Sequence, residues 1–361
     1  MQANLLSRGI GINLYPLNHL RELKSLQKLS LKKSISNSIT NDSSKLASSI
    51  DFKDIAGQEE AKRALTIAAA GGHHILLTGP PGSGKSMLAQ ALTGILPPLT
   101  QEEQLEVTCL HSLVTTNPGI ATERPFRQPH HALSLVGLVG GTAKLIPGEI
   151  TLAHRGILFL DEIAEFPRHH LEALRQPLSQ GSITLKKASG NVSYPAQFCL
   201  VAATNPCPCG FENRSSPVAT TQTKICTCTP YDKKRYQQKI SGPIRDRIDL
   251  HIFVESVPFK QLNSKNRDTT KTIRANVLLA RDIQKKRQQH MVNAEIPQQL
   301  IQKKLQSNHQ LSSTIEMIHT KLGLSMRATM SLMRVAQTIA DLENTEMSPE
   351  HIIEAAQYRQ L

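Results

Sequence analysis

The sequence predicts an α/β protein in which helices flank a parallel sheet, followed by a small all-α domain. Between residues 51 and 254, short apolar runs typical of buried strands alternate with segments of helical periodicity. Such alternation is typical of a parallel sheet covered by helices on both faces. Beyond this stretch strand-like runs end and helical patterns take over, at residues 269–289, 326–343 and 349–358. We therefore expect three parts, residues 1–50, 51–256 and 257–361.

The first fifty residues differ in composition from the rest of the chain. They are basic and rich in serine, a composition that is also typical of an organelle transit peptide. Residues 34–49 are dominated by serine and asparagine and show no apolar period. We expect this stretch to form a flexible linker.

A glycine-rich segment lies between an apolar run at residues 74–78 and a helical pattern that begins at Met87. Its residues are Gly79, Pro80, Pro81, Gly82, Ser83, Gly84, Lys85 and Ser86. Glycines at a strand-to-helix turn let successive backbone N–H groups surround a phosphate, and the helix directs its positive end at the same anion. The lysine of this pattern reaches the β and γ phosphates, and the Ser86 hydroxyl binds Mg²⁺. The segment predicts a site for ATP and Mg²⁺, although a glycine turn can also be purely structural.

Two further apolar runs end in polar residues. The run at residues 157–160 is followed by Asp161 and Glu162. We expect Asp161 to hold Mg²⁺ and Glu162 to polarise the attacking water. Acids at a strand end are often ordinary solvated charges, but a phosphate loop in the same chain favours the catalytic interpretation. The run at residues 201–204 ends in Asn205, a candidate for orienting the water or contacting the γ phosphate, although asparagine also commonly caps strands.

The charge balance favours a polyanionic partner. The chain carries 42 basic and 29 acidic residues, a formal net charge of +13, which points to nucleic acid or, alternatively, to scattered surface lysines. Tryptophan is absent and aromatics make up 4% of the residues, so contact with the phosphate backbone is expected rather than base stacking. The sequence shows neither a membrane-spanning run nor the core of a secretory signal, so we expect a cytoplasmic protein without a membrane partner.

Four cysteines form two close pairs, Cys207 with Cys209 and Cys226 with Cys228. Two such pairs can supply four thiolates to Zn²⁺, whereas disulfides are disfavoured in a reducing compartment. The single residue within each pair is a shorter gap than the usual two. Cys109 and Cys199 are expected to be small buried residues.

Several motifs occur together after residue 50, and they carry a family resemblance. They are Gly57-Gln58-Glu59, the phosphate loop, and the segments at residues 124–131, 160–166, 205–210 and 241–250. The set resembles the ComM/YifB family of magnesium-chelatase-like AAA+ ATPases, whose relatives by fold include the magnesium-chelatase ATPase subunit and the replicative MCM helicases. The resemblance implies a hexameric ring that hydrolyses ATP and moves DNA, with branch migration in recombination or natural transformation as the family's role.

The resemblance also implies roles for two arginines. Arg247 matches the arginine finger that enters a neighbouring subunit's site, where a planar guanidinium suits the charge that develops on the γ phosphoryl group. Arg245 is the alternative finger, and a surface salt bridge is the structural alternative for either residue. Arg327 resembles the second sensor arginine and acts either within its own chain or across the interface.

Residues 182–187 and 192–194 flank a Ser-Gly-Asn turn and are expected to form a hairpin. Related ATPases place a hairpin there, so Lys186 and Lys187 are candidate contacts with a DNA backbone in a ring pore. The alternative is a solvated hairpin whose lysines discourage aggregation.

The N-terminal part departs from the family pattern. Family members carry a Lon-protease-like domain before the ATPase, whereas about fifty residues precede it here, and residues 15–23 resemble the final helix of that domain. We therefore expect residues 1–50 to be a remnant of that domain together with the linker. Three functions stay open: a DNA motor, a chelatase-type remodelling subunit, and a truncated ATP-binding relic without motor activity.

Overall fold

The computed structural model describes residues 50–115, 119–141, 145–187, 190–212, 226–257, 268–288 and 291–359. They fall into two compact units, with residues 99–123 in one and the other described residues in the second. The smaller unit contains α4 (Gln101–Ser112), which opens with a capping box between Thr100 and Glu103. Cys109 is exposed on this helix, so the expectation that it is buried is wrong. α4 buries its neighbours Thr108 and Leu110 and leaves Cys109 on its open side.

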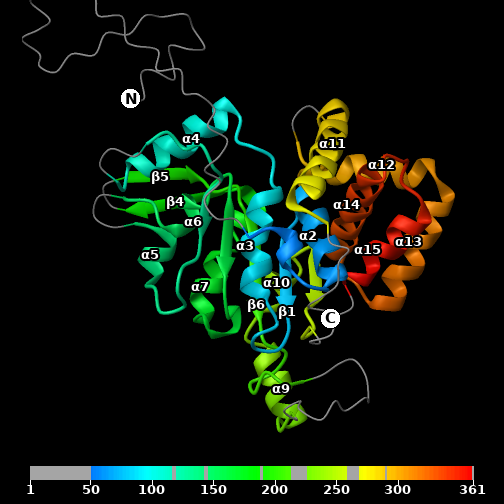
Figure 1. The fold of residues 1–361 in the computed structure, drawn as a ribbon, viewed down its shortest axis with the longest axis horizontal. Coiled ribbons are helices and arrows are strands. Elements are labelled where there is room, and N and C mark those ends of the chain that lie inside the picture. Colours follow the sequence, from blue (N-terminus) through cyan, green and yellow to red (C-terminus); the bar gives the residue numbers. More distant parts are fainter. Residues whose placement is uncertain are drawn as a thin grey trace, which may run out of the picture. The chain divides into compact units, whose positions relative to one another are not determined.

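A five-stranded parallel sheet forms the centre of the larger unit, in the order β2-β3-β6-β1-β7 (Figure 1). Its strands are β1 (Ile75–Thr78), β2 (Phe126–Arg127), β3 (Ile157–Leu160), β6 (Cys199–Thr204) and β7 (Leu250–Phe253). β3 and β6 are buried along their whole length, as expected for strands covered on both faces. Because all pairs are parallel, the carboxyl ends of these strands lie along one edge of the sheet.

Side chains of the strands alternate between two hydrophobic clusters, because successive residues of a strand point to opposite faces. One cluster joins Leu77, Phe159 and Val201 to α2 (Glu59–Gly71), α3 (Lys85–Ile95) and the C-terminal helices. The other joins alternate residues of the same strands to short helices on the opposite face: α5 (Leu135–Val139), α6 (Glu149–Leu152), α7 (Arg168–Ala173) and α10 (Gly242–Arg245). The α/β fold predicted from the sequence is confirmed.

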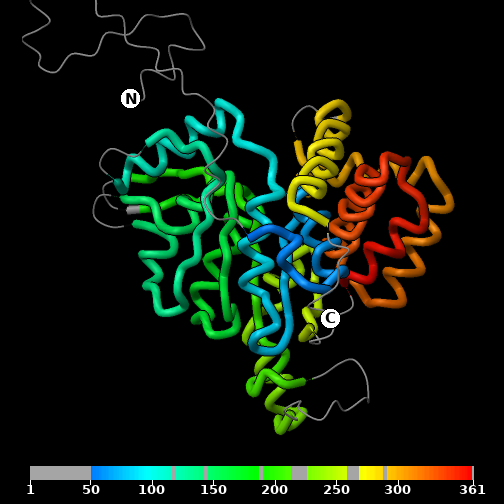
Figure 2. The backbone as a smooth tube through the Cα atoms, viewed as in Figure 1, coloured from blue at the N-terminus to red at the C-terminus, as the bar shows by residue number. Residues whose placement is uncertain are grey.

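The described residues of the C-terminal region contain helices and no strand. The region consists of α11 (Thr270–Gln288), α12 (Gln298–Ser307), α13 (His309–Leu322), α14 (Met326–Leu342) and α15 (Pro349–Gln357), with a short 3-10 turn, η5 (Asn293–Glu295). These bounds agree closely with the three helices expected here. Figure 2 shows this region, yellow to red, beside the blue segment that contains α2, and both contribute to the same hydrophobic cluster.

The predicted hairpin is present as a separate two-stranded antiparallel sheet. It pairs β4 (Ser182–Lys187) with β5 (Gly190–Pro195), in a register that places Lys186 opposite Asn191. Ile183 and Leu185 are buried and Lys186 is exposed, so the first strand alternates as the sequence suggested. In the part of the chain that the structure describes, no helix combines the length and the apolar composition needed to cross a membrane.

Candidate nucleotide-binding site

The phosphate loop occupies the turn between β1 and α3. Strand β1 lies between β6 and β7, so the loop leaves the sheet from an interior position. Gly84 is the N-cap of α3 with a φ of 89°, in the left-handed region that favours glycine. A Cβ atom on Gly79 would lie 2.2 Å from the Val254 carbonyl oxygen, so a larger residue does not fit there. Because Gly84 has no side chain to cap α3, the first N–H groups of the helix are available to an anion.

Lys85, the first residue of α3, directs its ammonium group at the loop. The Nζ atom donates to the carbonyl oxygens of Gly79 (2.7 Å) and Pro80 (2.9 Å) and to Oδ1 of Asn205 (3.4 Å). Burial lowers the pKa of Lys85, and the nearby charges of Asp161 and Glu162 oppose this effect. The lysine therefore lies where the phosphate loop and the ends of two other strands meet.

Ser86 and Asp161 are joined by a hydrogen bond from the serine Oγ to Oδ2 at 3.0 Å. The second carboxylate oxygen of Asp161 accepts the backbone N–H of Glu162, also at 3.0 Å. Mg²⁺ prefers oxygen ligands and is commonly held by one or two protein groups together with substrate phosphates. A hydroxyl and a carboxylate that already touch are a donor set that fits this ion.

Glu162 is exposed and has an unusual backbone conformation. Its φ is 50°, in the left-handed region that non-glycine residues rarely adopt. It directly follows Asp161 and forms the N-cap of a 3-10 turn, η3 (Ile163–Glu165). Backbone strain at a charged residue beside a ligand site is typical of functional positions.

Comparison with known sequences accounts for this arrangement. Residues 51–262 match the family described as magnesium chelatase, subunit ChlI, and residues 267–359 match the C-terminal part of the same subunit. The chain belongs to the magnesium chelatase ChlI family. This is an AAA+ family that implies ATP and Mg²⁺ as cofactors, so the resemblance found in the sequence is confirmed.

Curated relatives of two kinds match the chain. The uncharacterized protein YifB of Salmonella typhimurium is 42% identical over 334 residues, which cover 91% of this chain and 64% of YifB. The competence protein ComM of Haemophilus influenzae is 43% identical over 319 residues, covering 86% of this chain and 60% of ComM. The magnesium-chelatase 38 kDa subunit of Rhodobacter capsulatus is 28% identical over 174 residues, covering 43% of this chain and 50% of that subunit. The chain thus spans about three-fifths of the length of YifB and ComM.

The two predicted arginines are not bonded to the phosphate loop of their own chain, as far as the described residues show. Arg247 donates from Nε to the Ser179 hydroxyl (2.8 Å) and from Nη1 to the Pro243 carbonyl (2.7 Å). Burial lowers the pKa of Arg247, and the positive charges of Arg327 and Arg175 lower it further. Arg327 is the second residue of α14, so the charges that act on Arg247 include one from a helix of the C-terminal region.

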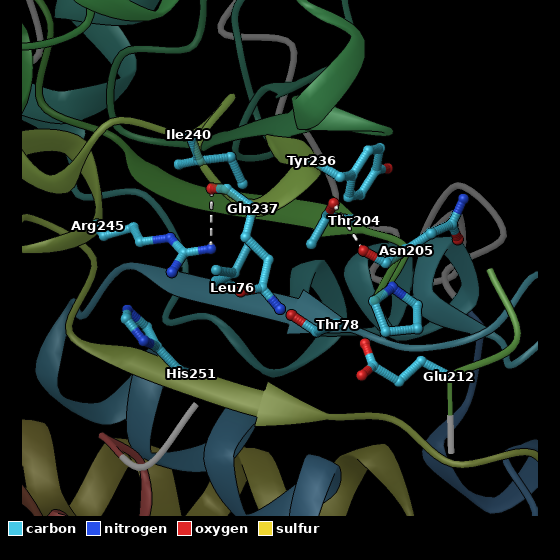
Figure 3. Close-up of a pocket in the computed structure, with 11 residues that line it drawn as sticks. Leu76, Thr78, Thr204, Asn205, Glu212, Tyr236, Gln237, Ile240, Arg245 and His251 are labelled. Carbon is cyan, nitrogen blue, oxygen red and sulfur yellow. Dashed lines mark hydrogen bonds between the residues drawn. The ribbon is translucent and has the colours of Figure 1, made fainter. Parts of the chain in front are cut away.

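Arg245, the alternative finger, lies in a different environment. Figure 3 shows Arg245 at one side of a pocket that is also lined by Asn205, Gln237 and His251. Its Nη2 donates to the Gln237 carbonyl oxygen at 3.2 Å. Arg245 thus lines a pocket of its own chain with a buried Nε atom, whereas Arg247 bonds to Ser179 and Pro243.

The structure also places the remaining predicted residues. The four cysteines Cys207, Cys209, Cys226 and Cys228 come together with their sulfur atoms within 4.8 Å of one another. Lys186 is exposed near the end of the β4–β5 hairpin, and Lys187 closes β4 with its side chain outside the described part.

The residue that the sequence motifs left without a role is Gln58. Its Nε2 donates to the Ser83 carbonyl oxygen at 2.6 Å and to the Glu255 carbonyl oxygen at 3.3 Å. The Gln58 backbone is left-handed, with a φ of 58°, and starts α2. Gln58 therefore supports the phosphate loop from the outside. The sequence signal for Gln58 is a glycine directly before it and two acidic residues directly after it. This pattern predicts a turn into a helix at Gln58.

Proposed function

We propose that this chain is a subunit of an ATP-hydrolysing AAA+ ring motor that acts on DNA, with branch migration or helicase activity in recombination or natural transformation as its role. The observation that carries the ATPase part is the convergence of Lys85, the Ser86–Asp161 pair and Asn205 at one edge of the sheet. A site assembled from three strand ends is the usual location of a ligand in parallel α/β proteins.

Each residue of this site has a distinct task in the proposed reaction. The loop amides and Lys85 bind and orient the phosphates, and Asn205 positions the attacking water. Glu162, exposed next to Asp161, accepts a proton from that water. Mg²⁺, when held by Ser86 and Asp161, supplies positive charge to the β and γ oxygens.

The arginine cluster supports a ring, with a hexamer as the proposed assembly. Arg247 and Arg327 lie close enough for their charges to interact, and neither is bonded to the phosphate loop among the described residues. A γ phosphate presented by a neighbouring subunit would supply the negative charge that this cluster attracts. Arg247 is thus proposed as the finger in trans and Arg327 as the second sensor.

DNA is the proposed partner for two reasons. The chain has a net charge of +13, and the exposed Lys186 and the adjacent Lys187 stand at the end of a hairpin. The relative from Haemophilus influenzae is named a competence protein, which fits a process that handles incoming DNA. Work on DNA would place this chain in the cytoplasm.

A chelatase-type remodelling subunit is the second candidate. The family match to magnesium chelatase and the 28% identity to the Rhodobacter capsulatus subunit favour it. Both candidates use the same ATP site, so they differ in what the ring acts on.

ATP hydrolysis by the purified chain, measured with single-stranded, duplex and branched DNA, separates the candidates. A DNA motor should hydrolyse ATP faster with at least one DNA form, and this stimulation should fall steeply with salt because phosphate contacts release counterions. A rate of hydrolysis that no DNA form changes favours the remodelling subunit. ATP binding without turnover in assembled rings indicates a nucleotide-binding chain without motor activity.

A further inference from the structure

The two cysteine pairs are distant from each other along the chain and close together in space. Cys207 and Cys209 lie in the turn that follows β6, and Cys226 and Cys228 lie directly before α9 (Pro230–Gln237). The sulfur atom of Cys207 is 3.3 Å from that of Cys209 and 3.7 Å from that of Cys226, and Cys209 and Cys226 are 3.5 Å apart. A tetrahedron of thiolates around a metal at about 2.3 Å has edges of about 3.8 Å. The observed separations are close to this value.

The chemistry of the group selects the kind of metal. Across the described ranges, these cysteines are the one set of three or more His, Cys, Asp or Glu residues with ligand atoms gathered closely enough to hold an ion. Mg²⁺ and Ca²⁺ require oxygen ligands, whereas four sulfurs in a tetrahedron suit Zn²⁺. All four cysteines are free, so no disulfide accounts for their proximity.

Backbone amides are already directed at these sulfur atoms. The N–H group of Glu212 faces Cys207, that of Phe211 faces Cys209, and that of Cys209 faces Cys228. Amide donors of this kind orient and stabilise metal-bound thiolates. The two halves of the group are also joined by an ion pair, 3.0 Å long, between Glu212 and Lys233 of α9.

We propose that Cys207, Cys209, Cys226 and Cys228 bind one Zn²⁺ as a structural site with no open coordination position. Each Zn–S bond replaces an S–H bond, so four protons pass to the solvent and no oxidation state changes. The assignment rests on the position of the sulfur atoms and does not depend on ATPase activity.

The location of the zinc site gives it a task in the ATPase, and this part rests on the proposed function. Gly210, which directly follows Cys209, approaches the phosphate loop so closely that a Cβ atom would lie 2.7 Å from Cδ of Pro81. Tyr236 of α9 is buried and lines the same pocket as Thr204 and Asn205 at the end of β6 (Figure 3). Zinc would therefore fix the loop that starts at Asn205 between the phosphate loop and α9, making the cysteines positioning residues.

Metal analysis of the full chain, purified under reducing conditions without chelators, tests the assignment. We expect one zinc ion per chain in the unaltered protein, and none in the double variant Cys226→Ser/Cys228→Ser. Cys109→Ser is the matched control because Cys109 is exposed and lies outside the group, and it should keep the full zinc content. Absence of zinc from the unaltered protein after reconstitution, or equal zinc in the double variant, would overturn the proposal.

Cobalt substitution covers the case in which the double variant fails to fold. Co²⁺ added to the metal-free unaltered chain should give thiolate-to-cobalt charge-transfer bands and the intense visible bands of a tetrahedral sulfur site. A weak octahedral spectrum would contradict the assignment. With a folded double variant, zinc loss should lower the rate of hydrolysis more than ATP affinity, because the displaced Asn205 acts on the attacking water. If the rate of hydrolysis and the ATP affinity fall by the same factor, the cysteines do not position Asn205. That result would not affect the assignment of the zinc site.

Discussion

The two edges of the central sheet hold charged side chains in different ways. At the carboxyl edge, Asp161 accepts a hydrogen bond from the Ser86 hydroxyl and one from a backbone N–H group. Its partners in these bonds are neutral, and Lys85 bonds to loop carbonyls and to Asn205. The carboxylate and hydroxyl oxygens can therefore bind a cation, which in turn binds the phosphates.

At the amino edge, Asp249 is fully engaged by the protein. Its side chain is 12% exposed. It accepts the His74 backbone N–H at 3.2 Å and the Ser331 hydroxyl, and it lies 3.4 Å from Nδ1 of His73 and 4.0 Å from Nη2 of Arg359. Ser331 and Arg359 come from the C-terminal region, so Asp249 joins that region to the sheet.

This contrast indicates that the carboxyl edge serves ligand binding and the amino edge serves stability. In parallel α/β sheets, ligands bind outside the carboxyl ends of the strands, and here the polar groups of that edge are only partly satisfied by the protein. Substitutions at the carboxyl edge should therefore change hydrolysis with little change in stability. Substitutions at the amino edge should do the reverse.

The largest effect is expected from Arg247, which bonds to Ser179 and Pro243. Arg247→Ala should lower the rate of ATP hydrolysis by about 10³ to 10⁵, because an arginine finger contributes that much to phosphoryl transfer. ATP binding should be retained, since the binding groups are Lys85 and the loop of the same chain. Steady-state hydrolysis and equilibrium binding of a fluorescent ATP analogue measure the two quantities.

A mixing experiment shows whether Arg247 acts across an interface. Rings that combine Arg247→Ala chains with Glu162→Gln chains should regain part of the activity, because some sites then receive both an intact base and an intact finger. Arg245→Ala is the matched control, and it should retain more activity since Arg245 lines a pocket of its own chain and buries its Nε atom. Mixed rings of confirmed composition that stay inactive would count against a finger in trans.

The next largest effect is expected at the carboxyl edge itself. Glu162→Gln should lower hydrolysis by about 10² to 10⁴, the contribution of general-base catalysis. Since Glu162 is exposed, the melting temperature and ATP affinity should stay close to those of the unaltered chain. Unchanged turnover would remove Glu162 from the mechanism and make Asp161 the single essential acid of this edge.

Local patterns predicted the carboxyl edge well. The glycine loop, the Asp161-Glu162 pair and Asn205 each follow an apolar run, and parallel strands necessarily bring such residues to one edge. The hairpin and the helices after residue 268 also carry periodic patterns, and the structure has them close to the expected positions.

The amino edge could not be predicted in the same way. Asp249 is 176 positions from His73 and 82 from Ser331, and no local period connects such distant residues. The exposure of Cys109 was missed for a related reason, because cysteine is usually buried and its position on α4 depends on which face of the helix is covered. Contacts between distant segments decide both cases.

Asp249→Asn tests the amino edge. Removing one charge from a buried, paired site should lower the free energy of unfolding by about 3 to 5 kcal/mol, while ATP hydrolysis per folded chain changes little. The surrounding groups hold the pKa of Asp249 well below its usual range despite its burial. The stabilisation is therefore present above the usual aspartate pKa and lost as the pH falls through the lower folded value. Urea unfolding measures the difference, and a large loss of hydrolysis in the folded variant would contradict the division between the edges.

The smallest effect is expected at His251, on β7 between the two edges. Burial lowers the pKa of His251 from 6.5 to about 4, helped by the charges of Arg359 and Arg245. The unfolded chain then binds a proton between these two pH values that the folded chain does not bind, so stability falls as the pH drops from 6.5 toward 4. His251→Gln should remove about 1 to 2 kcal/mol of the stability difference between pH 7 and pH 5, measured by urea unfolding.

His309→Gln is the control for this measurement, because His309 is exposed at the start of α13 and should keep the pH dependence of the unaltered chain. Nε2 of His251 is buried without a hydrogen-bond partner among the described residues. Replacing the ring by glutamine therefore breaks no hydrogen bond of this atom. If His251→Gln keeps the full pH dependence, the proton is taken up elsewhere. The histidines of the amino edge, next to Asp249, would then be the groups to substitute, and the acid sensitivity would belong to that edge and not to the strand between the two.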